Sequence, residues 1–539
     1  MPNTPPSDTA SSLADDAAGG DRRRSRWRAF VPGLAIFLVA LLARWHGIAG
    51  KPYWMDEVVT LQRAALSWPA LIGDSLHFHH LPSYFALIAG IEPFGTHEAW
   101  IRLPSALFGA GAAAAVFGIA RAIGGLEAGL LAGALMALSP TQVQYGQEAR
   151  SYAMVICCIA IALRGLVGLA LDPRAASRPW RDPGAARGPW ITYFGATLAG
   201  LNVLSVALFW VAAASIGAIG IARARQADAR GFLRNWGKVH AGLALLMAPW
   251  FTAMMVAAHG RVGNAVDWVP PISWGHVWSA IASVYLLRVG SLVTFHLFAA
   301  PVPGVAIGVA VLAVLGLIWL QRRRPARAVL AAGALGLPLA IGLISLVASL
   351  WMPRYLLWGA APFFVVAGLG IGMVPQRLRR PALALLLVLI GVNLLPYYSS
   401  ETKPRWDLAA ATLRQAGIGP GDMVLTEDPW GVGMTNVYLA RTGQALRPEQ
   451  WTVDPDRAQA RLVAGGRVWA LYGRVGQGAM TSTLDQFLAR IAELGRPASW
   501  IAEGRDVVLL RFDHPPPPEI ACADGQSTVG GDTADCAPR

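Results

Sequence analysis

Apolar runs of membrane-spanning length recur along most of this chain. A transmembrane helix needs about 20 mostly apolar residues, and such runs follow one another between residues 30 and 398. Hydrophobic residues make up 55 % of the 539-residue sequence and charged residues only 14 %, whereas a soluble domain carries about 25 % charged residues. The sequence therefore predicts a multi-pass membrane protein, an all-α bundle.

The apolar runs predict about eleven spans. The stretch 77–95 is not one of them, because it is short, has proline near both ends and carries Glu92. We interpret it as a helix lying in the outer interface. The predicted spans are 30–48, 99–121, 126–141, 152–171, 189–205, 207–222, 239–257, 295–319, 328–350, 355–374 and 381–398.

Lysine and arginine predict the orientation, because cytoplasmic connections carry the excess of these residues. With the N-terminus inside, the connections assigned to the cytoplasm hold 22 of them and the opposite connections hold 6. The net charge of +13 is spread over these clusters, which indicates membrane anchoring and no nucleic-acid partner. We expect an uncleaved first span, because no small-residue cleavage site follows it. The predicted location is the inner (plasma) membrane.

From about residue 400 the composition becomes that of a small α/β domain outside the cytoplasm. Helical patterns at 406–418, 435–443 and 483–495 alternate with strand patterns at 422–427, 467–473 and 506–512. The predicted organisation is a cytoplasmic tail (1–28), a transmembrane module (29–399), the α/β domain (400–514) and a disordered tail (515–539).

The chain has four cysteines, and they fall into two pairs. Cys157 and Cys158 lie inside an apolar run and are expected to be small core residues. Cys522 and Cys536 lie in the tail that is predicted to be outside, where an oxidising compartment would let them form a disulfide.

Unusual polar residues gather in the predicted outer connections. Polar groups near a bilayer are costly and tend to be functional, so their clustering on one side predicts a shared site. The first connection has Asp56 and Glu57 behind Tyr53 and Trp54, and then His80. The later candidates are Glu148, Arg150, Arg354 and Tyr355.

Each of these residues also has a structural interpretation. The acidic pair could open a helix, because acids favour the first turn, and histidines near residue 80 could be polar tips at the interface. Glu148 and Arg150 could pair with each other, and Arg354 could extend to the interface like other basic residues at span ends. We favour function for the adjacent acids, and phosphate binding for Arg354 because outer arginines are scarce.

These residues carry a resemblance. The series "YWMDE", "HHLPSYF", "IRLPSALFGA", "LSPTQVQYGQEARSYAM", "PRYLLWGAAPF" and "KPRWDLAAATLRQAG" resembles the GT-C glycosyltransferases. The similarity is to bacterial family 39-like enzymes, which are related to protein O-mannosyltransferases and lipid A aminoarabinose transferases. This chain departs from the pattern in "HLPSYF", which lacks one proline, and in "QEAR", where some relatives place an aspartate.

The resemblance implies transfer of a sugar from a polyprenyl-phosphate donor to a glycan, lipid A or protein outside the cytoplasm. Asp56 would take the acceptor's proton, supported by Glu57, and Glu148 is a further catalytic candidate. Arg354, with Arg150, His80 and Tyr355, would bind the donor phosphate. No metal ligands are assigned. A divalent cation stays open, since related oligosaccharyl enzymes use one and O-mannosyl relatives are not known for one.

Two other classes remain as alternatives. A transporter or lipid flippase would place ionisable residues near the bilayer midplane and show repeated halves, but the predicted spans are nearly free of acids. A non-catalytic assembly protein that binds partners through its outer domain would leave the adjacent acids unexplained.

Overall fold

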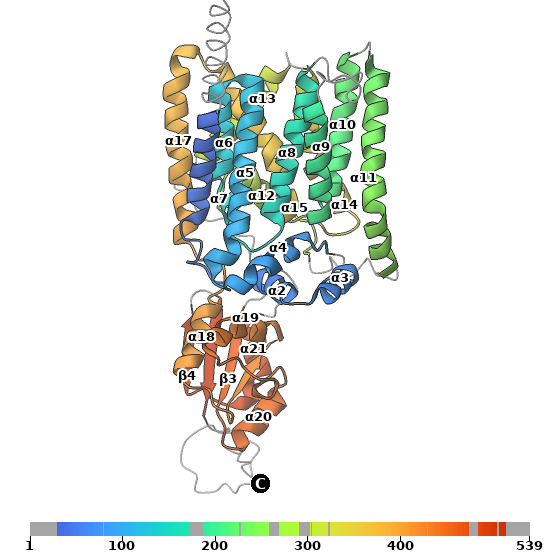
Figure 1. Ribbon diagram of the computed structural model, residues 1–539. Helices are drawn as coiled ribbons and strands as arrows, with labels where there is room; N and C mark the ends of the chain where they lie inside the picture. The colour runs from blue at the N-terminus through green and yellow to red at the C-terminus, as the bar shows by residue number, and fades with distance from the viewer. Residues whose placement is uncertain are drawn as a thin grey trace, which may run out of the picture. The chain divides into compact units, whose positions relative to one another are not determined.

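The computed structural model of the protein divides into two compact units (Figure 1). The first unit contains residues up to 50, 60–291 and 295–400, and the second contains 51–59, 292–294 and the chain from 401 onward. Both predicted tails lie outside the described residues, as do Cys522 and Cys536. The structure describes residues 30–78, 80–172, 187–225, 228–257, 269–289, 302, 304–321, 324–427, 429–473, 483–503 and 506–513.

The first unit is a helical bundle, and each predicted span contains a helix. Among the described residues, seven helices are long and apolar enough to cross a membrane. The remaining predicted spans are helices of 13 to 17 residues, so the number of crossings stays a prediction. One of the seven, Pro353–Met373, consists of several shorter helical pieces. The other long helices and the shorter span helices are Phe30–Trp45, α5 (Glu98–Gly124), α6 (Leu126–Leu138), α8 (Tyr152–Leu171), α9 (Arg187–Val203), α10 (Ala207–Arg225), α11 (Ala229–Ala257), α13 (Gly304–Leu320), α14 (Arg324–Ile344) and α17 (Gln376–Ser399).

Short helices complete the bundle. The span predicted at 355–374 is broken into helical pieces, and α3 and α4 gather at one end of the bundle (Figure 1). Helix α4 continues into a 3-10 turn, so the stretch interpreted as an interfacial helix does form a short helix. The short elements are α3 (Trp68–His77), α4 (Ser83–Ile91), η1 (Glu92–Phe94), α7 (Pro140–Gly146), α12 (Trp274–Val284), α15 (Pro353–Leu356), η4 (Leu357–Gly359), α16 (Ala360–Leu369) and η5 (Gly370–Met373).

A fully buried arginine, Arg44, donates hydrogen bonds to backbone carbonyls where the chain breaks between α6 and α7. Pro140 begins α7 and has no N–H, so the carbonyl of Met136 lacks its usual helical donor. The guanidinium of Arg44 donates to the carbonyls of Met136 (3.3 Å) and Ala137 (2.9 Å) in the last turn of α6. A Cβ at Gly109 would lie 2.3 Å from Nε of Arg44. Gly109 therefore leaves the space that the Arg44 side chain occupies.

The second unit contains a five-stranded mixed sheet in the order β2-β1-β3-β5-β4. Strands β2, β1 and β3 are parallel, and β5 runs antiparallel to both β3 and β4. Figure 1 labels β3 and β4 of this sheet and the helices α18, α19, α20 and α21. The elements are α2 (Met55–Ala64, whose first half belongs here), α18 (Trp406–Gln415), β1 (Met423–Thr426), α19 (Pro429–Leu439), η6 (Ala440–Thr442), η7 (Pro448–Gln450), β2 (Trp451–Thr452), α20 (Pro455–Val463), β3 (Val468–Gly473), α21 (Leu484–Arg490), η9 (Ala492–Leu494), β4 (Ser499–Glu503) and β5 (Val507–Phe512).

Helices cover both faces of this sheet. Alternate residues of β1 and β3, such as Met423 and Ala470, pack with Leu462 of α20 and Phe487 of α21 in one apolar core. Helices α18 and α19 contact each other and the sheet, and the buried indole of Trp406 lies so close to Gly473 that a Cβ there would be 2.3 Å away. The predicted α/β architecture is therefore present.

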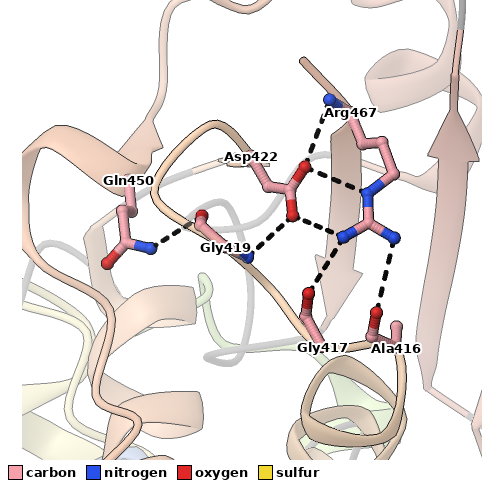
Figure 2. Close-up of polar contacts among 6 residues, drawn as sticks. All are labelled: Ala416, Gly417, Gly419, Asp422, Gln450 and Arg467. Atoms are coloured by element: carbon pink, nitrogen blue, oxygen red, sulfur yellow. Dashed lines mark hydrogen bonds and ion pairs between the residues drawn. The ribbon is translucent and has the colours of Figure 1, made fainter.

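An ion pair fastens the start of β1 to the start of β3 (Figure 2). The carboxylate of Asp422 accepts hydrogen bonds from the Arg467 guanidinium at 2.6 Å and 3.0 Å and from the backbone N–H of Gly419 at 2.8 Å. The same guanidinium donates to the carbonyl of Gly417 (2.9 Å), just after α18. Burial alone would raise the pKa of Asp422, but the bonds from Arg467 and Gly419 outweigh it and lower that pKa.

Asp422→Asn should weaken the sheet domain at neutral pH by about 1–3 kcal/mol, the usual contribution of hydrogen bonds to a charged group. Because the folded-state pKa is lowered, the stabilisation is present above the unfolded value of about 3.9 and is lost as the pH falls through the folded value. The measurement is hydrogen exchange of β1 and β3 in the full chain at each pH, corrected for intrinsic rates. Exposed Glu493 provides the control Glu493→Gln. Equal protection of Asp422→Asn and wild type at pH 7 would contradict the expectation.

Candidate active site

The adjacent acids of the first predicted outer connection lie in the first turn of α2. The carboxylate of Glu57 accepts a 3.4 Å hydrogen bond from the backbone N–H of Trp54, the residue before the helix. This is one half of a capping box, and acids here also interact favourably with the helix dipole. The structural interpretation of the pair is therefore correct for Glu57, while Asp56 is half-buried in the same turn.

A lysine from the other end of the chain holds Glu57 in place. The ammonium of Lys403 lies 2.7 Å from the Glu57 carboxylate, and the two side chains are 3 % and 0 % exposed. A buried charge that loses its partner is strongly destabilising, so this pair constrains the first turn of α2. The lysine belongs to the "KPRW" stretch, in which the sequence alone indicates no candidate site residue.

The two aromatic residues before the acids are buried in protein, with Tyr53 0 % and Trp54 4 % exposed. The backbone N–H of Tyr53 donates to the hydroxyl of Tyr438 at 2.6 Å. The guanidinium of Arg441 lies over the rings of both tyrosines, 5.7 Å and 4.9 Å from their centroids. Contacts with residues 438–441 therefore fix this loop.

The second predicted outer connection lies between α7 and α8, and its acid Glu148 is fully buried. The amide of Gln147 donates to the carbonyls of Arg44 (2.8 Å) and His46 (2.7 Å) and accepts from the hydroxyl of Tyr397 (2.8 Å). Glu148 follows directly, so the network around Gln147 fixes the backbone that carries this carboxylate.

Arg150 ends the same turn and is tied to α4 and α5. Its carbonyl accepts from the hydroxyl of Ser105 (3.2 Å), which also bonds the hydroxyl of Tyr84 (2.7 Å). Its guanidinium lies 3.4 Å from the hydroxyl of Thr60 and above the ring of Tyr152. The loop, the short helix α4 and the start of α5 therefore form one connected hydrogen-bonded group.

His80 lies just before α4 and is half-buried. Its ring meets Phe85 edge-on, with 6.2 Å between centroids, and the guanidinium of Arg63 lies 5.2 Å from the centroid of that same Phe85 ring. Arg63 in turn pairs with Asp74 at 2.6 Å. Arg63 therefore lies near His80, the predicted phosphate-binding histidine.

The remaining phosphate candidates, Arg354 and Tyr355, are on α15. Arg354 is only 8 % exposed, so it is enclosed by protein more than an arginine that extends to the interface would be. The side-chain amide of Gln142 in α7 donates to the carbonyl of Leu357 (3.2 Å), and the hydroxyl of Tyr285 donates to that of Leu356 (3.3 Å). The first bond joins α7, the helix that leads into Glu148, to η4 directly after α15, and the second joins the end of α12 to α15.

The predicted site residues thus fall into two groups. Glu148, Arg150, His80, Arg354 and Tyr355 belong to the helical unit, where α4, α5, α7 and α15 are linked by the bonds described above. Asp56 and Glu57 belong to the second unit, together with the lysine and tyrosine that hold their loop.

The part of the chain that the structure describes contains no obvious metal-binding site. No group of three or more histidine, cysteine, aspartate or glutamate side chains comes together there. The predicted phosphate-binding residues of the helical unit are two arginines, a histidine and a tyrosine, and arginine is a side-chain type that often binds phosphate in proteins.

Comparison with known proteins finds likeness at the level of fold. No protein-family model and no curated protein sequence matches the chain. The structure is similar to ArnT from Cupriavidus metallidurans in the apo state, with a TM-score of 0.55 and 14 % identity over 90 % of this chain and 98 % of the other. For ArnT from Cupriavidus metallidurans bound to undecaprenyl phosphate the TM-score is 0.50 and the identity 14 %, over 89 % and 97 %. The predicted fold class is confirmed as a mostly helical membrane bundle with a C-terminal α/β domain, a fold similar to that of ArnT.

Proposed function

We propose that this protein is an integral-membrane glycosyltransferase that uses a polyprenyl-phosphate-linked sugar and acts outside the cytoplasm. The observation that carries the proposal is the fold shared with ArnT over 90 % of the chain, together with an acid in the first turn of the helix after the first outer loop. An ArnT structure with undecaprenyl phosphate bound supports a lipid donor of the same class. The sugar and the acceptor (glycan, lipid A or protein) stay open.

In the proposed reaction Asp56 accepts the proton of the acceptor hydroxyl while the acceptor oxygen forms a bond to the anomeric carbon. The bond from that carbon to the phosphate oxygen breaks, and its electron pair leaves with the polyprenyl phosphate. Arg354, with Arg150, His80 and Tyr355, stabilises the charge that develops on the phosphate. Attack from the opposite side inverts the anomeric centre. Glu148, fully buried, is the second candidate for the base.

The test uses purified protein in lipid vesicles with radiolabelled sugar on a polyprenyl phosphate, and follows label into candidate acceptors and release of the polyprenyl phosphate. Transfer that requires the protein supports the proposal. Movement of labelled lipid or sugar across the bilayer without any change of covalent linkage would instead support the transporter or flippase alternative.

The predicted topology, N-terminus inside and α/β domain outside, can be tested with single cysteines. Gly421 is exposed and has open space around a Cβ, so Gly421→Cys should react with an impermeant thiol reagent in intact cells. Gly237, in a connection assigned to the cytoplasm, has the same properties and should react only after the cells are opened. Cys522 and Cys536 are replaced by serine in both variants. The reverse labelling pattern would refute the topology and the shared outer site.

A further inference from the structure

The first outer loop is held along its length by the C-terminal part of the chain. The ammonium of Lys51 donates to the hydroxyl of Thr402 (3.0 Å), the N–H of Tyr53 to the hydroxyl of Tyr438, and Lys403 pairs with Glu57. Three residues within this seven-residue stretch therefore have partners that lie more than three hundred residues away in sequence. We name this set of contacts between 51–57 and 402–441 the loop clamp.

The Lys403–Glu57 pair is the charged element of the loop clamp. Both side chains are buried, and the same Glu57 carboxylate accepts from the N–H of Trp54. One carboxylate thus joins the lysine, the residue before α2 and the first turn of α2. Asp56 lies between Trp54 and Glu57 in that turn, so the pair fixes the backbone from which the Asp56 side chain extends.

We propose that Lys403 is a positioning residue for sugar transfer: through Glu57 it holds the first turn of α2 so that Asp56 can reach the acceptor hydroxyl. This rests on the proposed function, because it assigns the α/β domain a part in building the acidic side of that site. A base must lie within hydrogen-bond reach of the proton it takes, and small misplacements of such a group cost large factors in rate.

The test compares Lys403→Met, Lys403→Arg and the double variant Glu57→Gln/Lys403→Met in the full chain. Lys403→Met leaves a buried carboxylate without its cation, which is costly, so hydrogen exchange of peptide 51–59 should rise by about tenfold or more. The kcat of transfer should fall by about 10²-fold, with the KM for the donor little changed. Lys403→Arg should retain most of the activity, because it keeps the positive charge.

A matched control is Arg447→Met, a cation of the same unit outside residues 402–441. It removes an exposed 4.0 Å pair with Glu449 and should change neither loop exchange nor transfer. Lys403→Met with unchanged loop exchange, or with faster exchange and full transfer, would overturn the proposal.

The double variant keeps the test decisive if Lys403→Met unfolds the domain, which faster exchange in β1 and β3 would reveal. Removing both charges leaves none uncompensated, so the double variant should keep a folded sheet but, without the pair that positions Asp56, should transfer sugar more slowly than wild type. A folded double variant that transfers sugar at the wild-type rate would overturn the proposal. If wild type itself transfers no sugar, the proposed function fails, while loop exchange still decides whether Lys403 holds the loop.

Discussion

Asp56→Asn should lower sugar transfer by about 10²–10⁴-fold, the usual contribution of a positioned acid or base. The substitution keeps the shape of the side chain but removes the basic lone pair that would take the acceptor's proton. Thermal stability should change little, because Asp56 is only half-buried. The measurement is the single-turnover rate of transfer from a labelled polyprenyl-phosphate sugar, with unfolding followed in parallel.

Variants of the other two acids, Glu57 and Glu148, test which carboxylate acts as the base. Glu57→Gln should lower activity less than Asp56→Asn at the chemical step, but the structure predicts a cost in stability, because Lys403 would lose its buried partner. If Asp56→Asn keeps near wild-type transfer while Glu148→Gln abolishes it, the base lies in the second outer connection and the assignment is wrong.

Arg354→Ala should lower kcat/KM for the donor by about 10²–10³-fold, as expected for the loss of a donor that stabilises transition-state charge, and Arg354→Lys should lower it less. A guanidinium can bind a phosphate through two parallel hydrogen bonds, whereas an ammonium acts as a point charge. The low exposure of Arg354 strengthens the expectation, since charges interact more strongly away from water. The assay is donor-dependent transfer by variants that elute and unfold like the wild type.

A second arginine provides the control. Arg379 pairs with Glu127 at 3.4 Å and lies in a connection assigned to the cytoplasm, so Arg379→Ala should leave donor use unchanged. Full transfer by both the alanine and the lysine variants of Arg354 would mean that the phosphate is bound elsewhere. Arg150 would then be the next candidate.

Apolar runs and residue patterns predicted much of the fold. Each predicted span contains a helix because burial in a bilayer requires long apolar segments, whatever their neighbours. Strands β1, β3 and β5 were visible as short runs of β-branched and apolar residues. Strand β4 was missed because it lies at the sheet edge with alternating burial and an exposed Trp500, and β2 because it is only two residues long.

Partners distant in sequence could not be predicted for the candidate site. The adjacent acids stood out, because carboxylates are rare beside apolar spans, but nothing in the local pattern pairs Glu57 with Lys403 across an intervening 345 residues. The network that holds Gln147 likewise depends on a carbonyl of Arg44 and the hydroxyl of Tyr397. Such contacts follow from tertiary packing, which residue spacing does not encode.

The buried arginine near the end of the first bundle helix has a consequence for how the protein is made. An arginine inside a bilayer costs a few kcal/mol even by insertion measurements. Besides the carbonyl of Ala40 one turn earlier, the carbonyls that accept from Arg44 belong to residues 136, 137 and 142, synthesised about a hundred residues later. While the ribosome is still making those residues, the side chain must remain near the lipid headgroups. The first helix is therefore expected to settle to its final depth only after α6 and α7 have entered the membrane.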